Sequence, residues 1–106
     1  MVERNRPIIW SSGARSDLSE IWSYYFNVAG RTTADKIIRE IAETSRLLED
    51  HPFAGRSRDE VRRGLRSIAA RPYVLFYRIA GDRAEIVRVL DGRRDLDEIF
   101  ASSAKE

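Results

Sequence analysis

Apolar residues recur with helical spacing through the first half of the chain. The first stripe, with steps of three or four residues, predicts an amphipathic helix and contains Leu18, Ile21, Trp22, Tyr25 and Ala29. The second stripe has the same spacing and contains Ala34, Ile37, Ile38, Ile41, Ser45 and Leu48. Because only a few residues separate the two stripes, the helices should form an antiparallel hairpin, which must end before Pro52.

Polar and glycine residues predict where these helices begin and end. Ser12 is the expected N-cap of the first helix, and Gly30 is expected to stop it in the left-handed conformation. Thr32 with Asp35 three residues later has the form of a capping box for the second helix. Asp17 is expected simply to favour the positive end of the first helix.

Shorter apolar runs predict strands on either side of the hairpin. The run from Pro7 to Trp10 suits an edge strand, because Pro7 cannot donate a ladder hydrogen bond. Three further strands are expected at 65–70, 73–77 and 84–90, with Gly81-Asp82 as a hairpin turn. A short terminal helix should begin at Asp95 and carry Leu96, Ile99 and Phe100.

These elements predict an α+β fold in one domain spanning residues 1–106, in the order β-α-α-β-β-β. The helical hairpin would pack on one face of a small antiparallel sheet, and the short helix would follow at the C-terminus. If the helices cover one face, the other face is expected to be open and lined by alternate strand residues. Arg88 should then project opposite to Val87 and Val89.

The amino-acid composition limits the kinds of site that the chain can form. Of the 19 basic residues 17 are arginines, and the net charge is +2. The chain has no cysteine and one histidine, His51, so neither a disulfide framework nor a metal site of thiolates or paired imidazoles is expected, and no cofactor is implied. No apolar run is long enough for a membrane span, which predicts a cytoplasmic protein.

The strands and the residues next to them concentrate the candidate binding side chains. These are Arg66, Arg71, Tyr77, Arg88, Arg93 and Arg94. Arginine forks suit a polyanion or an acidic peptide. The alternative is that these arginines form ordinary surface ion pairs, and this is the favoured interpretation for Arg78 and Arg83 beside the hairpin turn.

Several motifs at fixed spacing resemble the RelE/ParE toxin superfamily, in particular its ParE-like branch. They are Gly64-Leu65-Arg66-Ser67, Tyr73-Val74-Leu75-Phe76-Tyr77-Arg78, Ile86-Val87-Arg88-Val89-Leu90 and Gly92-Arg93-Arg94-Asp95-Leu96. The segment 17–22 resembles the family's first helix, and 48–56 resembles the end of its second helix with the loop that follows. The resemblance spans nearly the whole chain and implies the toxin half of a type II toxin–antitoxin pair.

The superfamily holds two activities. RelE-like members cleave messenger RNA in the ribosome with basic residues and a histidine or tyrosine. This chain departs from that pattern at Val74, Asp91 and Phe100, and His51 lies in a helix-ending turn. A nuclease would have to use Arg66, Arg94 and Asp91. The resemblance therefore favours a ParE-like poison of DNA gyrase that catalyses nothing itself, with the nuclease and a degenerate, non-toxic interaction module as alternatives.

All three alternatives imply the same partner, a ParD-like antitoxin, often a ribbon-helix-helix DNA-binding protein, whose C-terminal segment wraps the toxin. Apolar anchors and acidic residues on that segment would suit the arginines and the apolar hairpin surface here. The residues expected on that apolar surface are Ile21, Trp22, Tyr25, Ile38 and Ile41.

Overall fold

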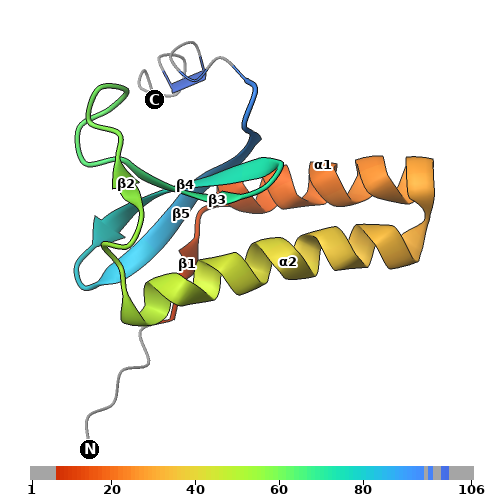
Figure 1. The fold of residues 1–106 in the computed structure, drawn as a ribbon, viewed down its shortest axis with the longest axis horizontal. Helices are drawn as coiled ribbons and strands as arrows, with labels where there is room; N and C mark the ends of the chain where they lie inside the picture. The colour runs from red at the N-terminus through yellow and green to blue at the C-terminus, as the bar shows by residue number, and fades with distance from the viewer. Residues whose placement is uncertain (1–6, 95, 97–98, 101–106) are drawn as a thin grey trace, which may run out of the picture.

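The computed structural model describes residues 7–94, 96 and 99–100. Two long helices, α1 (Ser12–Ala29) and α2 (Arg31–Asp50), lie side by side and pack against a five-stranded sheet, as Figure 1 shows. The strands are β1 (Ile9–Trp10), β2 (Arg56–Ser57), β3 (Arg66–Ala70), β4 (Tyr73–Ala80) and β5 (Arg83–Asp91). The predicted α+β class and helical hairpin are confirmed. Neither helix is long and apolar enough to cross a membrane.

The helix boundaries follow the predicted signals with two corrections. The N-cap of α1 is Ser11 rather than Ser12, and its hydroxyl oxygen accepts a hydrogen bond from the Ala14 amide at 3.0 Å. Gly30 ends α1 at a φ of +91°, but its ψ of 172° is extended, not left-handed helical. The same glycine is the N-cap of α2, so the expected capping box at Thr32 does not form. Asp35 instead accepts a hydrogen bond from the indole nitrogen of Trp22 at 2.9 Å.

The strands are ordered β1-β5-β4-β3-β2. β3, β4 and β5 form an antiparallel meander, but β1 runs parallel to β5, so the expected purely antiparallel sheet is wrong and the sheet is mixed. Parallel strands need a long connection, and the two helices with β2, β3 and β4 supply it between β1 and β5. The two-residue β2, which pairs with β3 at Ser67 and Arg66, was not predicted.

Each face of the sheet has its own apolar cluster. The main core lies under the helices, where Ile21 and Ile41 pack against strand residues such as Leu75, Tyr77 and Ile86. The opposite face is not open, contrary to expectation. A second cluster covers it with the buried side chains of Leu65, Phe76, Leu90 and Phe100. Phe76 and Leu90 come from β4 and β5, and Leu65 from the loop before β3 and Phe100 from the C-terminal residues cover them.

Leu96, Ile99 and Phe100 are helical, in agreement with the predicted terminal helix, whereas its predicted first residue, Asp95, lies outside the described residues. The Phe100 ring packs edge-on against Phe76 with ring centroids 5.2 Å apart. The main chain of Phe100 is also held, because its carbonyl oxygen accepts a hydrogen bond from the Arg62 guanidinium at 3.1 Å. These contacts attach the C-terminal segment to the helix-free face of the sheet.

Candidate partner-binding site

Two of the predicted binding residues hold an internal loop. The Tyr77 hydroxyl donates to the Pro52 carbonyl at 2.8 Å and accepts from the Gly55 amide at 2.9 Å. The Arg66 guanidinium donates to the carbonyl oxygens of Phe53 and Gly55 at 3.1 and 2.8 Å and lies over the Phe53 ring. Tyr77 is completely buried and Arg66 is half-buried. These side chains therefore fasten the connection between α2 and β2, and Tyr77 offers no surface to a partner.

Gly55 is the reason that this loop can approach the sheet so closely. A Cβ atom at this position would lie 2.5 Å from the Ser67 carbonyl oxygen and 2.6 Å from the Tyr77 hydroxyl. Both distances are shorter than a van der Waals contact, and one of the opposing atoms belongs to the backbone. Any side chain at Gly55 would therefore displace the loop from Tyr77.

The predicted binding residue Arg88 forms an ion pair with Asp17 of α1. Its Nε and a terminal nitrogen donate to the two carboxylate oxygens at 2.8 and 3.0 Å, a two-pronged geometry that arginine favours. The hydrogen bond with Asp17 raises the pKa of Arg88 above its ordinary value. Asp17 also accepts the Val89 amide at 2.8 Å. Asp17 was expected only to interact with the helix dipole. Its side chain is instead nearly buried and forms hydrogen bonds with β5.

Residues at the N-terminal end of α1 also bond to the edge of β5 that lacks a neighbouring strand. β1 pairs with β5 only at Glu85 and Ile86, so the following residues of β5 have no neighbouring strand on that side. Ser11 bonds there instead: its amide donates to the Ile86 carbonyl at 3.0 Å, and its hydroxyl donates to the Val87 carbonyl at 3.1 Å. Ser11 and Asp17 thus provide hydrogen-bond partners for backbone groups of β5 that would lack them at an unpaired edge.

A β-bulge determines where Arg88 points. Phe76 pairs with Arg88, whereas the next residue, Tyr77, pairs with Ile86, so Val87 is the extra residue in β5. Val87 consequently packs with the second cluster, while Val89 lies in the main core. The prediction that Arg88 projects opposite to both valines is wrong, because the bulge places the two valines on different faces.

A groove runs along α1 beside this edge of the sheet. Two adjoining hollows form it, with volumes of about 550 and 260 Å³, and they share Asp17, Glu20 and Arg88 as lining residues. One hollow reaches Arg62 and Phe100, and the other reaches Tyr24 and Arg94. We call these two hollows together the α1 groove. Side chains of both charge signs line it, among them Glu20 and Arg94.

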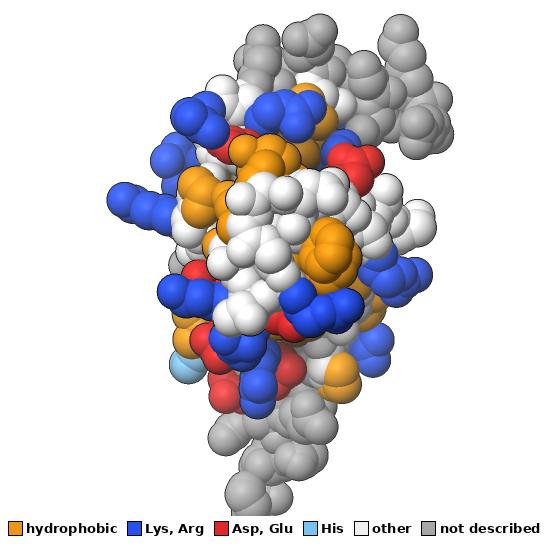
Figure 2. All heavy atoms as spheres, turned by 90° about the vertical axis from the view of Figure 1, so that its right-hand side faces the viewer, with side chains coloured by type: hydrophobic (Ala, Val, Ile, Leu, Met, Phe, Trp, Pro, Cys, Tyr) orange, Lys and Arg blue, Asp and Glu red, His pale blue; other side chains and the backbone are white. Residues whose placement is uncertain are grey.

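The helical hairpin extends this surface away from the sheet. Tyr24, which lines the α1 groove, is 59% exposed, and Val28 one turn later is 60% exposed. Figure 2 looks onto this end of the molecule and shows hydrophobic side chains among basic and acidic ones. Of the predicted apolar surface, Trp22, Tyr25 and Ile38 are half-buried, whereas Ile21 and Ile41 belong to the core. Sequence reasoning missed Tyr24 and Val28 because they lie off the apolar stripe.

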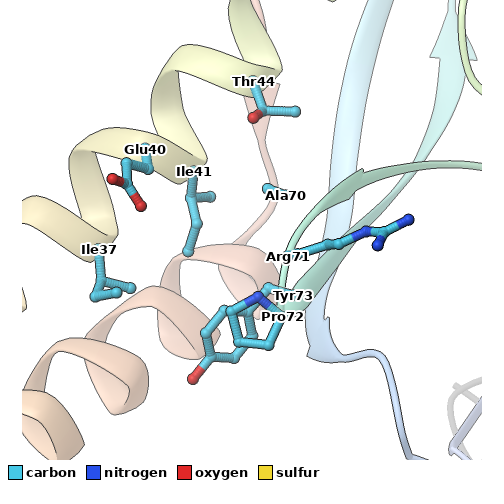
Figure 3. A pocket seen from close by; sticks show the side chains of 8 residues that line it. All are labelled: Ile37, Glu40, Ile41, Thr44, Ala70, Arg71, Pro72 and Tyr73. Carbon is cyan, nitrogen blue, oxygen red and sulfur yellow. The ribbon is translucent and has the colours of Figure 1, made fainter.

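A separate pocket of about 210 Å³ lies between α2 and the turn that joins β3 to β4. Ile37 and Glu40 form one wall, and Pro72 and Tyr73 lie opposite, as Figure 3 shows. The predicted binding residue Arg71 is exposed, and its guanidinium points away from the pocket (Figure 3). Burial and a hydrogen bond with Tyr25 raise the pKa of Tyr73, so its hydroxyl stays protonated.

The two C-terminal arginines differ in their contacts. Arg93 binds Asp91 through two guanidinium nitrogens at 3.0 and 2.8 Å and through its backbone amide at 2.9 Å. These bonds lower the pKa of Asp91 to about 2, which makes its carboxylate a weak base. Arg94 is exposed at the rim of the α1 groove. The described residues contain no cluster of three metal-ligating side chains.

Comparison with known proteins identifies the family. Residues 8–96 match the family model described as "ParE toxin of type II toxin-antitoxin system, parDE". The chain belongs to the ParE toxin family. Toxin ParE1 of Mycobacterium tuberculosis (strain H37Rv) is 35% identical over 88 residues, which cover 82% of this chain and 90% of that protein. Toxin ParE1 of Caulobacter vibrioides is 36% identical over 85 residues, covering 80% and 88%.

A solved structure shares the ParE fold described above. A chain of the "Chromosomal ParDE TA system from P. aeruginosa" superimposes with a TM-score of 0.73 and 23% identity, over 84% of this chain and 98% of that chain. The matched family segment includes α1, α2 and all five strands, and therefore the whole Asp17–Arg88 pair and Asp91. The resemblance inferred from the sequence motifs is confirmed at the level of family and fold.

Proposed function

We propose that this ParE-family chain poisons DNA gyrase and that a cognate antitoxin neutralises it. The observation that favours a binding poison over a nuclease is that two of the three candidate nuclease residues, Arg66 and Asp91, are already bonded to other groups of the chain. Arg66 is held by the loop carbonyls of Phe53 and Gly55, and Asp91 is held by Arg93. A general base with a pKa of about 2 would contribute little to activation of a ribose hydroxyl. The gyrase target rests on the resemblance to ParE-like toxins and implies action in the cytoplasm.

The proposed antitoxin partner is ParD-like, with a DNA-binding part that is often ribbon-helix-helix and a C-terminal segment that covers the α1 groove. The hollows along α1, the exposed Tyr24 and Val28, and the rim arginine Arg94 support this placement. Apolar side chains of the segment would pack on Tyr24 and Val28, and its charges would meet Glu20 and Arg94. Arg88, which lines the groove, and Arg71 and Arg93, which lie outside its lining, remain proposed contacts.

The decisive test measures gyrase and translation with one toxin preparation. Purified toxin should inhibit supercoiling or accumulate cleaved plasmid with gyrase, transcripts should stay intact on ribosomes, and added antitoxin should reverse the inhibition. Ribosome-dependent transcript cutting that is lost in Arg94→Ala, with gyrase unaffected, would establish the RNA endonuclease instead. Expression without any growth defect would point to the non-toxic interaction module.

The antitoxin surface has its own test. Tyr24→Ala should weaken binding of the antitoxin by about tenfold or more, as loss of an aromatic anchor does in other interfaces. Leu47→Ala is the matched control, since Leu47 is 56% exposed on α2, outside the lining of the α1 groove. Equal weakening by the two substitutions, measured by titration calorimetry, would show that the segment binds elsewhere.

A further inference from the structure

Charge is divided unevenly between the two layers of the molecule. Residues 12–50, which form the helical hairpin, carry five basic and seven acidic side chains, a net charge of −2. Residues 51–94, which form the sheet from β2 to β5 and its loops, carry eleven arginines and five acidic side chains, a net charge of +6. In Figure 2, acidic and basic side chains mix over the lower half of the visible face, and basic ones predominate over the upper half.

On the helix-free side, arginines from two segments surround one shallow pocket. Arg62 and Arg63 come from the loop before β3, and Arg78 comes from β4. The pocket has a volume of about 180 Å³, and Leu65 and Val87 are among its apolar lining residues. We call Arg62, Arg63 and Arg78 the arginine triplet.

The arginine triplet has few internal partners. Arg78 pairs with Glu85 at 2.8 Å, but its side chain is still 60% exposed. Arg62 donates to the Phe100 carbonyl oxygen and forms no ion pair with a carboxylate among the residues that the structure describes. Arg63 is exposed and forms no hydrogen bond or ion pair with any residue in the described part of the chain. Within the described part of the chain, Glu85 is therefore the one carboxylate that pairs with the arginine triplet.

This arrangement fits the phosphate backbone of a nucleic acid better than an acidic peptide. A peptide needs a groove for its own side chains, and the pocket of about 180 Å³ is much smaller than the α1 groove. A phosphate backbone needs only exposed donors on a surface of one sign, and arginine forks match phosphate oxygens. The segment that carries the pocket, residues 51–94, has a net charge of +6, which favours a polyanion with closely spaced charges.

We propose that the arginine triplet binds the phosphate backbone of duplex DNA. The inference rests on the proposed function, because the substrate of gyrase is DNA and a toxin that holds both would stay on their complex. Such contacts would add affinity without sequence preference, since phosphates position a protein on DNA but do not specify bases.

The test uses fluorescence anisotropy of the purified chain with a labelled duplex of mixed sequence, titrated over a range of salt. The double variant Arg63→Gln/Arg78→Gln should reduce the slope of log affinity against log salt by about 2 and weaken binding about tenfold at low salt. Arg62 is left in place because it also holds Phe100. The matched control is Arg39→Gln/Arg46→Gln, which removes the same charge from exposed positions on α2 and should change affinity less than about twofold.

Three outcomes would overturn the inference: no binding of duplex DNA, equal weakening by both double variants, or binding of single-stranded RNA in preference to the duplex. Circular dichroism of each variant separates loss of binding from loss of fold. A parallel supercoiling assay separates this inference from the proposed function. Gyrase inhibition without DNA binding would remove the DNA surface alone, whereas DNA binding without gyrase inhibition would support the surface and remove the proposed target.

Discussion

Two arginine–carboxylate pairs in this chain have nearly the same geometry and very different surroundings. In both pairs the closest nitrogen–oxygen distance is 2.8 Å, and in both the carboxylate also accepts a backbone amide. Arg88 and Asp17 come from β5 and α1, 71 positions apart, and their side chains are 27% and 10% exposed. Arg93 and Asp91 are two positions apart in one turn, and the Arg93 side chain is 88% exposed.

The difference shows that bond length alone does not reveal how much an ion pair contributes to the stability of the fold. The Asp17–Arg88 pair joins the first helix to the last strand and closes an edge of the sheet, so breaking it would uncover several polar groups at once. Removal of one member of a largely buried pair leaves the other charge without compensation. The Asp91–Arg93 pair organises only its own turn, and water can replace either partner.

The largest effect is expected for Asp17→Ala. The substitution leaves Arg88 without its carboxylate and the Val89 amide without an acceptor, and we expect a loss of about 2–3 kcal/mol in the free energy of unfolding. Urea denaturation followed by circular dichroism measures it. Asp91→Ala is the matched control, and equal losses in the two variants would mean that burial does not separate the pairs.

A smaller loss is expected for Arg88→Lys. Lysine keeps the charge but has a single ammonium group, so it cannot reproduce the two parallel bonds to the Asp17 oxygens. We expect a loss of about 1–2 kcal/mol in the free energy of unfolding. A thermal or urea midpoint equal to that of the wild type would show that charge, rather than the two-pronged geometry, stabilises the edge of β5.

The two pairs also differ in how far they could be predicted. Asp91 and Arg93 lie so close in the sequence that a local turn brings them together, and pairing of the surface arginines with nearby acids was a stated alternative. The Asp17–Arg88 pair depends on the path of the whole chain and on the bulge at Val87, which no local pattern announces. One signal was present: Asp17 lies one helical turn from both Ala14 and Ile21, on the face that is buried.

The fold shows the same difference between local features, which could be predicted, and long-range contacts, which could not. Apolar spacing predicted both helices, and apolar runs with a hairpin turn predicted the three main strands, because these signals lie within each element. β2 has only the polar residues Arg56 and Ser57, and its pairing comes from the loop that Tyr77 and Arg66 hold. The parallel direction of β1 and the covering of the helix-free face by Phe100 likewise depend on contacts between distant segments.

The stabilisation from the Asp91–Arg93 pair should be lost only in acid. Its bonds lower the pKa of Asp91 from 3.8 to about 2, so the folded chain binds fewer protons than the unfolded chain between these values. The stabilisation is therefore fully present above about pH 4 and disappears as the pH falls through about 2. Asp91→Asn should be slightly less stable than the wild type near neutrality and should converge with it near pH 2. Parallel stability curves without convergence would contradict the assignment.

The smallest effect is expected for Arg93→Gln, which removes the exposed member of the same pair. The guanidinium already lies almost wholly in water, so its loss exposes no apolar surface and leaves no buried group unsatisfied. The backbone amide of residue 93 can still bond to Asp91, which keeps the turn closed. We therefore expect no measurable change in the urea midpoint at neutral pH. Arg88→Gln is the control, because the same substitution at the edge of β5 should clearly lower the urea midpoint. A comparable drop in Arg93→Gln would mean that the C-terminal turn supports the sheet as strongly as α1 does.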